Sequence, residues 1–438
     1  MNSSFEFLDY LIFSLYAFII LRVGLWVSRT KDGKEKSAED YFLASKSLPW
    51  WAIGSSLIAA NISAEQFIGM SGSGFALGLA IASYEWMAAI TLIIVGKYFL
   101  PIFIEKGLYT IPEFVEKRFS SNLKTILAIF WIGLYVFVNL ASVMYLGGLA
   151  LETIIGIDMI YAVIGLALFA AAYSLYGGLS AVAWTDIIQV IFLVLGGLVT
   201  TFLALNTVSQ GEGVIEGFKH IYNAAPDRFE MILDKNNPEY KNLPGIGVLI
   251  GGLWVANLYY WGFNQYIIQR TLAAKSLKES QKGILFAAGL KLIIPIVVVI
   301  PGIAAYVIVN DPELLASLGK NGMLNMPAEG KADKAYPWLM QFLPVGLKGV
   351  AFAALAAAIV SSLASMLNST STIFTMDIYK QLINKEADDR KTVKVGRLSA
   401  AIALTIGATM APLLGGIDQA FQFIQHQLLS LVLIKIKI

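Results

Sequence analysis

The sequence predicts an all-α polytopic membrane protein in which one leading helix is followed by two inverted repeats of five helices each. Three observations lead to this prediction. The chain has 438 residues, of which 57% are hydrophobic and only 14% are charged, whereas soluble domains carry about 25% charged residues. Eleven apolar segments follow one another along the chain. Two of them, the second and the seventh, are interrupted by polar residues and glycines.

Each apolar segment is predicted to be a helix, because a backbone in hydrocarbon must form its hydrogen bonds within its own segment. The predicted segments are 7–28, 48–72, 76–104, 124–154, 157–176, 180–206, 245–268, 283–308, 346–375, 398–416 and 418–435. We expect a single transmembrane domain over residues 1–438. In it, 7–28 is the leading helix, 48–206 the first repeat and 245–435 the second.

Lysine and arginine gather in the loops after segments 1, 3, 7 and 9, whereas the short connections after segments 2, 4 and 10 carry neither. The loop after segment 7, for instance, carries Arg270, Lys275, Lys278 and Lys282. Short loops rich in these residues remain in the cytoplasm. We therefore expect a multi-pass protein of the inner (plasma) membrane, surrounded by lipid, with its N-terminus outside.

The two interrupted segments lie five segments apart. Residues 60–66 interrupt segment 2, and residues 257–265 interrupt segment 7. An odd repeat length makes the second copy enter the membrane in the opposite sense, and matching interrupted helices in inverted repeats predict a ligand site at the middle of the membrane. Packing of small residues is the competing explanation for segment 2. It does not account for Asn61, Ser63, Glu65 and Gln66 together.

Two residues of opposite charge lie at membrane depth, Glu85 in segment 3 and Lys291 in segment 8. A charge there costs at least ~2.5 kcal/mol on insertion scales, so it normally faces a water-filled cavity or a partner. The pair predicts a polar chamber. Further donors and acceptors for a neutral polar ligand are Gln66, Asn257 and Gln425, while Tyr260 offers a flat apolar face for which simple packing is the competing explanation.

A site for a hard cation such as sodium needs oxygen ligands. Segment 9 has adjacent hydroxyls at Ser361 and Ser362, although serine in a membrane helix also bonds back to its own carbonyls. A broken segment 2 adds free carbonyls near Ala59 and Ile62. Asp186, near the start of segment 6, is interpreted first as a helix N-cap and alternatively as a group behind the ion site.

Several function classes are disfavoured. The chain has no cysteine and only two histidines, which excludes disulfides and cysteine-ligated metals and argues against a histidine-based catalytic or zinc site. No nucleophile–base pair stands out. We expect no enzymatic activity, no organic cofactor and no nucleic-acid partner.

Three motifs carry a resemblance to a known family. Segment 2 from Ser56 to Gly74, the stretch Trp254–Gln265 and the stretch Ala356–Ser362 resemble the sodium/solute symporter family, and the resemblance runs from about residue 8 to Gln425. It implies an inverted-repeat transporter core of five plus five helices with one extra N-terminal helix. It also implies alternating-access symport of a sugar, galactose or glucose, with sodium as the coupling ion.

The resemblance implies a role for each candidate residue. Sugar contacts fall on Gln66, Glu85, Asn257, Lys291 and Gln425, with Tyr260 stacked on the sugar as the inner gate. The outer side is closed by Met70, Tyr84 and Phe421. Sodium is held by the carbonyls of Ala59, Ile62 and Ala358 and the hydroxyls of Ser361 and Ser362, and Asp186 helps it leave toward the cytoplasm.

Two features depart from the family pattern. Ala88 stands where a relative has a sugar-contacting serine, and one lost neutral hydrogen bond typically costs ~0.5–1.5 kcal/mol. After Gln425 the sequence no longer resembles the family, so we expect a truncated C-terminus with an incomplete, atypical last helix. A membrane-embedded sugar sensor without net transport and a truncated, inactive transporter fragment remain alternatives.

Overall fold

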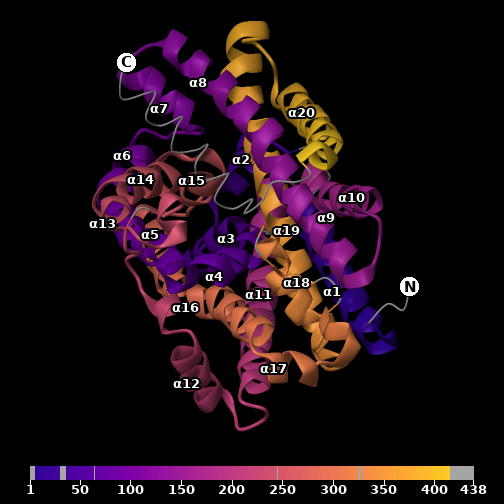
Figure 1. Ribbon diagram of the computed structural model, residues 1–438. Helices are drawn as coiled ribbons and strands as arrows, with labels where there is room; N and C mark the ends of the chain where they lie inside the picture. The colour runs from indigo at the N-terminus through magenta and orange to yellow at the C-terminus, as the bar shows by residue number, and fades with distance from the viewer. Residues whose placement is uncertain are drawn as a thin grey trace.

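A computed structural model describes residues 5–29, 36–63, 65–243, 245–323, 326–328 and 330–414 (Figure 1). These residues form helices and no strand. Nine helices within the described ranges are long and apolar enough to cross a membrane. Segment 2 falls short of that length because it is broken, and segment 11 lies outside the described residues. The predicted all-α membrane fold is confirmed.

The helices of the first half follow the predicted segments closely. They are α1 (Phe7–Ser28), α3 (Trp50–Asn61), α4 (Ser71–Leu77), α5 (Ser83–Ile94), α6 (Leu100–Glu105), α8 (Ser121–Gly133), α9 (Ala141–Ile155), α10 (Met159–Gly177) and α11 (Leu179–Val208). A π-helical turn, Leu134–Leu140, joins α8 to α9. The short helices α2 (Ala38–Leu43) and α7 (Ile111–Arg118) lie in the connections.

The second half contains five main helices, including the longest one in the described part of the chain. They are α14 (Leu253–Phe263), α15 (Gln265–Leu272), α16 (Leu277–Asn310), α19 (Leu347–Ile373) with a π-helical extension over Phe374–Ile383, and α20 (Asp389–Met410). The connections hold α12 (Val214–Ala224), α17 (Pro312–Ser317) and α18 (Ala335–Met340), whereas α13 (Gly245–Gly247) continues through a π-helical turn, Val248–Gly252, into α14. In Figure 1 α12 and α17 lie at the opposite end of the molecule from α7.

Both predicted helix interruptions exist, but the second is narrower than expected. In segment 2 the helix ends at Asn61, Ile62 leaves helical geometry (φ −80°, ψ 93°), and a π-helical turn begins at Glu65. In segment 7 the break falls on Asn264 alone (φ −84°, ψ 120°). The prediction of a break over 257–265 is wrong because Asn257 stays helical, its side-chain amide donating to the Leu253 carbonyl at 3.0 Å.

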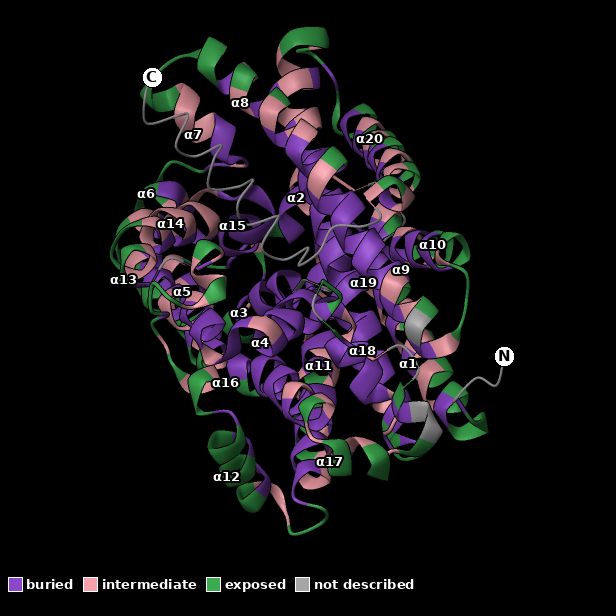
Figure 2. Ribbon diagram, viewed as in Figure 1, coloured by how far each residue is buried: buried purple, intermediate pink, exposed green. Residues whose placement is uncertain are grey.

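The core of the molecule is α19 with its extension. In its most apolar stretch of 18 residues, 94% of the residues are buried, compared with 22% in the corresponding stretch of α1. Figure 2 shows this helix as a buried column crossed by α11 and flanked by α1 and α10, which are more exposed. The helix α11 crosses α19 at close range. Gly196 makes this possible, because a side chain at that position would collide with Ala354. The positions near the middle of α19 are therefore shielded from lipid on every side.

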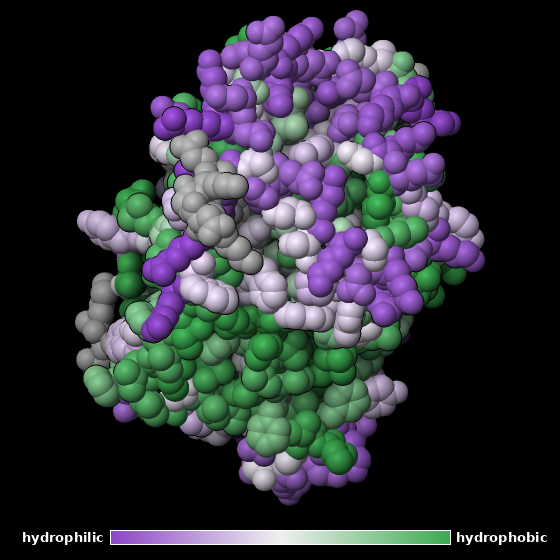
Figure 3. Space-filling view, turned by 180° about the vertical axis from the view of Figure 1, so that it is seen from behind, coloured by the Kyte–Doolittle hydropathy of each residue, from purple (hydrophilic) through white to green (hydrophobic). Residues whose placement is uncertain are grey.

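The surface separates into an apolar and a polar part. Figure 3 shows a broad hydrophobic area below a region of hydrophilic side chains. The start of α1 lies beside the start of α19, because Asp9 Oδ1 accepts the backbone N–H groups of Gly346 and Gly349 at 2.8 Å each. Asp9 is fully buried, so it caps α19 instead of reaching the membrane surface as its place near the helix end would suggest.

Candidate functional site

A small cavity lies between the broken segment 2, α5, α14 and α16. It has about 40 Å³ of free volume. Its lining residues are Asn61, Gln66, Tyr84, Glu85, Ala88, Ala256, Asn257, Tyr260, Trp261 and Lys291. All the predicted sugar contacts within the described residues are among them. Gln425, and the predicted outer-gate residue Phe421, lie outside the described residues.

The Glu85–Lys291 pair forms one wall of this cavity. Lys291 Nζ lies 2.5 Å from Glu85 Oε2, and both side chains are buried. The same ammonium donates to Oδ1 of Asn61 and lies 5.1 Å from the ring centroid of Trp261. Two buried charges are tolerated only when they are paired and hydrogen-bonded, and this arrangement meets that condition.

Asn61, the last residue of α3, connects this pair to the predicted gate. Its amide nitrogen donates to the Tyr260 hydroxyl at 2.9 Å, and the hydroxyl oxygens of Tyr260 and Tyr266 lie 2.6 Å apart. The sequence identified Asn61 only as part of the interruption. Its position at a helix end inside the membrane was the signal for a more specific role.

The side chain of Gln66 stabilises the helix break in segment 2. Its Oε1 accepts the backbone N–H of Ser63 at 3.0 Å, and a helix interruption leaves such groups without intrahelical partners. Tyr84 lines the cavity, whereas Met70 is fully buried in the adjoining core. Ala88, which replaces the expected serine, also lines the cavity.

The predicted sodium ligands come from two elements that touch. Ser362 Oγ donates to the carbonyl of Ala60 at 2.9 Å, so the middle of α19 contacts the end of α3. The carbonyls of a helix's last turn have no intrahelical partner, and Ala59 lies in that turn. Ala59, Ile62, Ala358, Ser361 and Ser362 are all buried. Such neutral oxygens suit a hard monovalent cation.

Asp186 does not cap a helix, so the first interpretation of this residue is wrong. Gly178 turns the chain with a positive φ of 65°, which glycine adopts without strain, and α11 already begins at Leu179. Asp186 is therefore two turns inside the helix and fully buried. It accepts hydrogen bonds from Ser361 and Ser56, each at 2.5 Å, which places it directly behind the predicted sodium ligands.

The prediction that Arg270 lies in a cytoplasmic loop is also wrong. The break at Asn264 is followed by α15, which returns into the protein, and Arg270 is only 1% exposed. Its Nη2 lies 3.8 Å from Asp186 Oδ2. A single arginine after an apolar segment gives no sequence signal for such burial.

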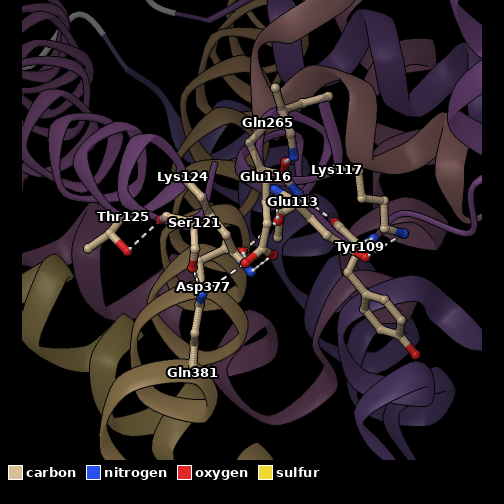
Figure 4. A network of polar contacts seen from close by, with 12 residues as sticks. Tyr109, Glu113, Glu116, Lys117, Ser121, Lys124, Thr125, Gln265, Asp377 and Gln381 are labelled. Atoms are coloured by element: carbon tan, nitrogen blue, oxygen red, sulfur yellow. Dashed lines mark hydrogen bonds and ion pairs between the residues drawn. The ribbon is translucent and has the colours of Figure 1, made fainter. Parts of the chain in front are cut away.

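A second polar network lies at the end of the molecule that holds α7 (Figure 4). Lys124 of α8 lies between Glu116 of α7 (2.8 Å) and Asp377 of the α19 extension (3.4 Å). Thr110 donates to Asp377 at 2.9 Å. Gln265 of α15 accepts the backbone N–H of Ile111 at 2.9 Å. The hydrogen bond from Lys124 lowers the pKa of the Glu116 carboxyl.

Comparison with known proteins supplies the class. A sequence model of the sodium:solute symporter family matches residues 41–434. The chain is 71% identical over 421 residues to a Vibrio parahaemolyticus protein named sodium/glucose cotransporter, covering 96% of this chain and 78% of that relative. It is 33% identical over 445 residues to human sodium/myo-inositol cotransporter 2, covering 96% of this chain but only 63% of the human protein.

The fold agrees with these relatives. A solved Na⁺-coupled sialic acid symporter, in a substrate-bound outward-open state, superposes with a TM-score of 0.82 at 25% identity, covering 93% of this chain and 82% of that one. These matches define a multi-pass secondary transporter. The chain belongs to the sodium:solute symporter family, and the resemblance seen in its motifs is confirmed.

Proposed function

We propose that this chain carries out sodium-coupled symport of a sugar, galactose or glucose, into the cell by alternating access. The observation that carries the proposal is the single cavity wall in which Glu85, Lys291 and Asn61 meet, next to the oxygen-rich contact between α3 and α19. A sugar is neutral and presents both donors and acceptors. Buried groups of both kinds on rigid helices suit it.

In this proposal Gln66, Glu85, Asn257, Lys291 and Gln425 contact the sugar. Tyr260 is the inner gate, and the outer gate is formed by Met70, Tyr84 and Phe421. Sodium is held by the carbonyls of Ala59, Ile62 and Ala358 and the hydroxyls of Ser361 and Ser362, with Asp186 on its exit path. The two repeats are residues 48–206 and 245–435, and the N-terminus lies outside the cell's inner membrane.

The size of the cavity defines what must change when sugar binds. A water needs roughly 10–15 Å³ of such volume, so the 40 Å³ present corresponds to a few waters and not to a hexose. Sugar hydroxyls must therefore replace contacts that Lys291 makes with Glu85 and Asn61, and the surrounding helices must separate. The cavity of the described conformation is therefore too small to hold a hexose.

Sodium and sugar are coupled through α3 in this proposal. Its last turn supplies the Ala60 carbonyl that accepts from Ser362 of α19 and the Asn61 side chain toward the cavity. A ligand shifts a conformational equilibrium only by binding one state more tightly than another. Sodium bound between α3 and α19 fixes the position of Asn61, and the affinity for sugar depends on that position.

Uptake into proteoliposomes tests the proposal. Radiolabelled galactose or glucose should accumulate under an inward sodium gradient and not under an equal potassium gradient. Competition by unlabelled myo-inositol shows whether the site also binds the compound for which the human relative is named. Sugar uptake that ignores the sodium gradient would refute symport. Sugar binding by calorimetry without uptake would favour the sensor, and neither binding nor uptake would favour the inactive fragment.

A further inference from the structure

We propose that Arg270 is a positioning residue for the coupling ion. It balances the charge of Asp186 and holds α15 against the two helices that supply the ion's oxygens. The inference rests on the proposed sodium-coupled transport and adds a residue that sets how tightly sodium is held.

The burial of Arg270 requires an explanation. The side chain is only 1% exposed and is among the largest fully buried side chains of the described residues. A buried guanidinium without compensation is strongly destabilising, because both its charge and its five N–H donors lose water. The groups that surround Arg270 must therefore replace that hydration.

The partners of Arg270 come from three different helices. Nε donates to Ser56 Oγ of α3 at 2.6 Å, and Nη2 donates to Ser365 Oγ of α19. Asp186 of α11 supplies the opposite charge at 3.8 Å. The helices α3 and α19 are those whose oxygens converge at the predicted sodium site, and Ser365 lies one turn from Ser361. Arg270 thus ties α15 to both walls of that site.

The hydrogen bonds give Asp186 a specific effect on Ser361. One carboxylate oxygen accepts from Ser361 and the other from Ser56, each at 2.5 Å. A hydroxyl has one donor and two lone pairs. When Ser361 donates its only proton to Asp186, both lone pairs of its oxygen are left to bind a cation. Asp186 therefore prepares Ser361 as a ligand, and Arg270 keeps the carboxylate's charge balanced.

The same residue is linked to the gate. Nη1 of Arg270 donates to the Tyr266 carbonyl within α15, and the Tyr266 hydroxyl lies 2.6 Å from that of Tyr260. A movement of α15 large enough to separate the two tyrosines would also displace Arg270 from Ser56 and Ser365. The balance of charge beside the ion then changes as the gate moves.

Sodium binding measured without sugar tests this role. The readout is the thermal unfolding midpoint of the purified protein as sodium chloride replaces choline chloride at constant ionic strength. Arg270→Met removes the charge that repels sodium while Asp186 remains, so the half-saturating sodium concentration should fall about tenfold. Asp186→Asn should raise it by a similar factor. Arg270→Lys, which keeps the charge, should stay near the wild-type value.

The double variant Arg270→Met/Asp186→Asn keeps the net charge and leaves no unpaired buried ion. Its sodium dependence should return toward that of the wild type, and it remains testable if Arg270→Met alone does not fold. Two results would overturn the inference. One is an unchanged sodium affinity in both charge variants. The other is an equal loss of sodium affinity in both single variants, with the two losses adding up in the double variant. A wild-type protein that shows no sodium-dependent shift would instead contradict the proposed function.

Discussion

Among individual residues, Lys291 depends most on its partners. It is fully buried and bonded to Glu85 and Asn61. Lys291→Ala should abolish sugar uptake and lower the free energy of unfolding by about 3–5 kcal/mol, because Glu85 is left as an unpaired buried charge. Combining it with Glu85→Gln should recover much of the stability and none of the uptake. Thermal unfolding and proteoliposome uptake check this, and full uptake by the double variant would contradict the assigned role.

Ser362 tests the ion site separately from the sugar site. Its hydroxyl donates to the Ala60 carbonyl at 2.9 Å. Ser362→Ala should raise the sodium concentration for half-maximal uptake about tenfold and leave the sugar KM at saturating sodium close to normal. Thr370→Ala is a matched control, because the hydroxyl of Thr370 bonds back to Met366 of the same helix. A higher sugar KM with unchanged sodium dependence would argue against a sodium ligand here.

The sequence predicts that the polar residues at membrane depth share a cavity. Gln66, Glu85, Asn257 and Lys291 are costly in hydrocarbon unless they share a cavity, and the structure brings them together around one. Arg270 could not be predicted in the same way. Charge after an apolar segment usually means a loop, and only the return of the chain at Asn264 carries Arg270 back into the interior.

At the scale of helices, an interruption could be predicted where polar side chains and glycines occur together. Segment 2 combines polar residues with glycines, and it breaks where expected. Segment 7 combines two asparagines with aromatic residues that fit a helix, and because Asn257 stays helical the break is confined to Asn264. The prediction that Asp186 caps α11 fails for a similar reason, because the turn before this helix depends on Gly178 and not on the charge of Asp186.

The polar network around α7 gives a pH-dependent prediction. Lys124 lowers the pKa of Glu116, so this ion pair stabilises the folded protein above the unfolded-state pKa of glutamate, and its contribution is lost as the pH falls through the lowered value. Lys124→Met should therefore destabilise the protein at neutral pH, and the loss should shrink on acidification. Melting curves between pH 7 and acidic pH measure the difference from wild type.

The control for that network is Lys117→Met. Lys117 pairs with Glu113 of the same helix at 2.9 Å, but the lysine is 42% exposed, and exposed pairs of this kind contribute little. Its melting temperature should hardly change at any pH. If Lys124→Met behaves in the same way, then the link from α7 through Asp377 to the α19 extension contributes no stability.

For the molecule as a whole, alternating access predicts that sodium changes which side the cavity faces. The chain has no cysteine, so a cysteine introduced at Ala256, in the cavity wall, is the only thiol. In oriented proteoliposomes sodium alone should speed its labelling by an impermeant maleimide from outside, because sodium favours the state that receives sugar. Added galactose should slow it, since the closed cavity holds only about 40 Å³ of free volume.

A cysteine at Lys235, in an exposed connection, should be labelled at the same rate under all three conditions, which separates a change in cavity access from a change in thiol reactivity. Slower labelling in sodium would mean that the ion stabilises the closed or inward-facing state first. The order of binding would then be reversed, and the coupling through α3 would have to act by sugar fixing Asn61 before sodium enters between α3 and α19.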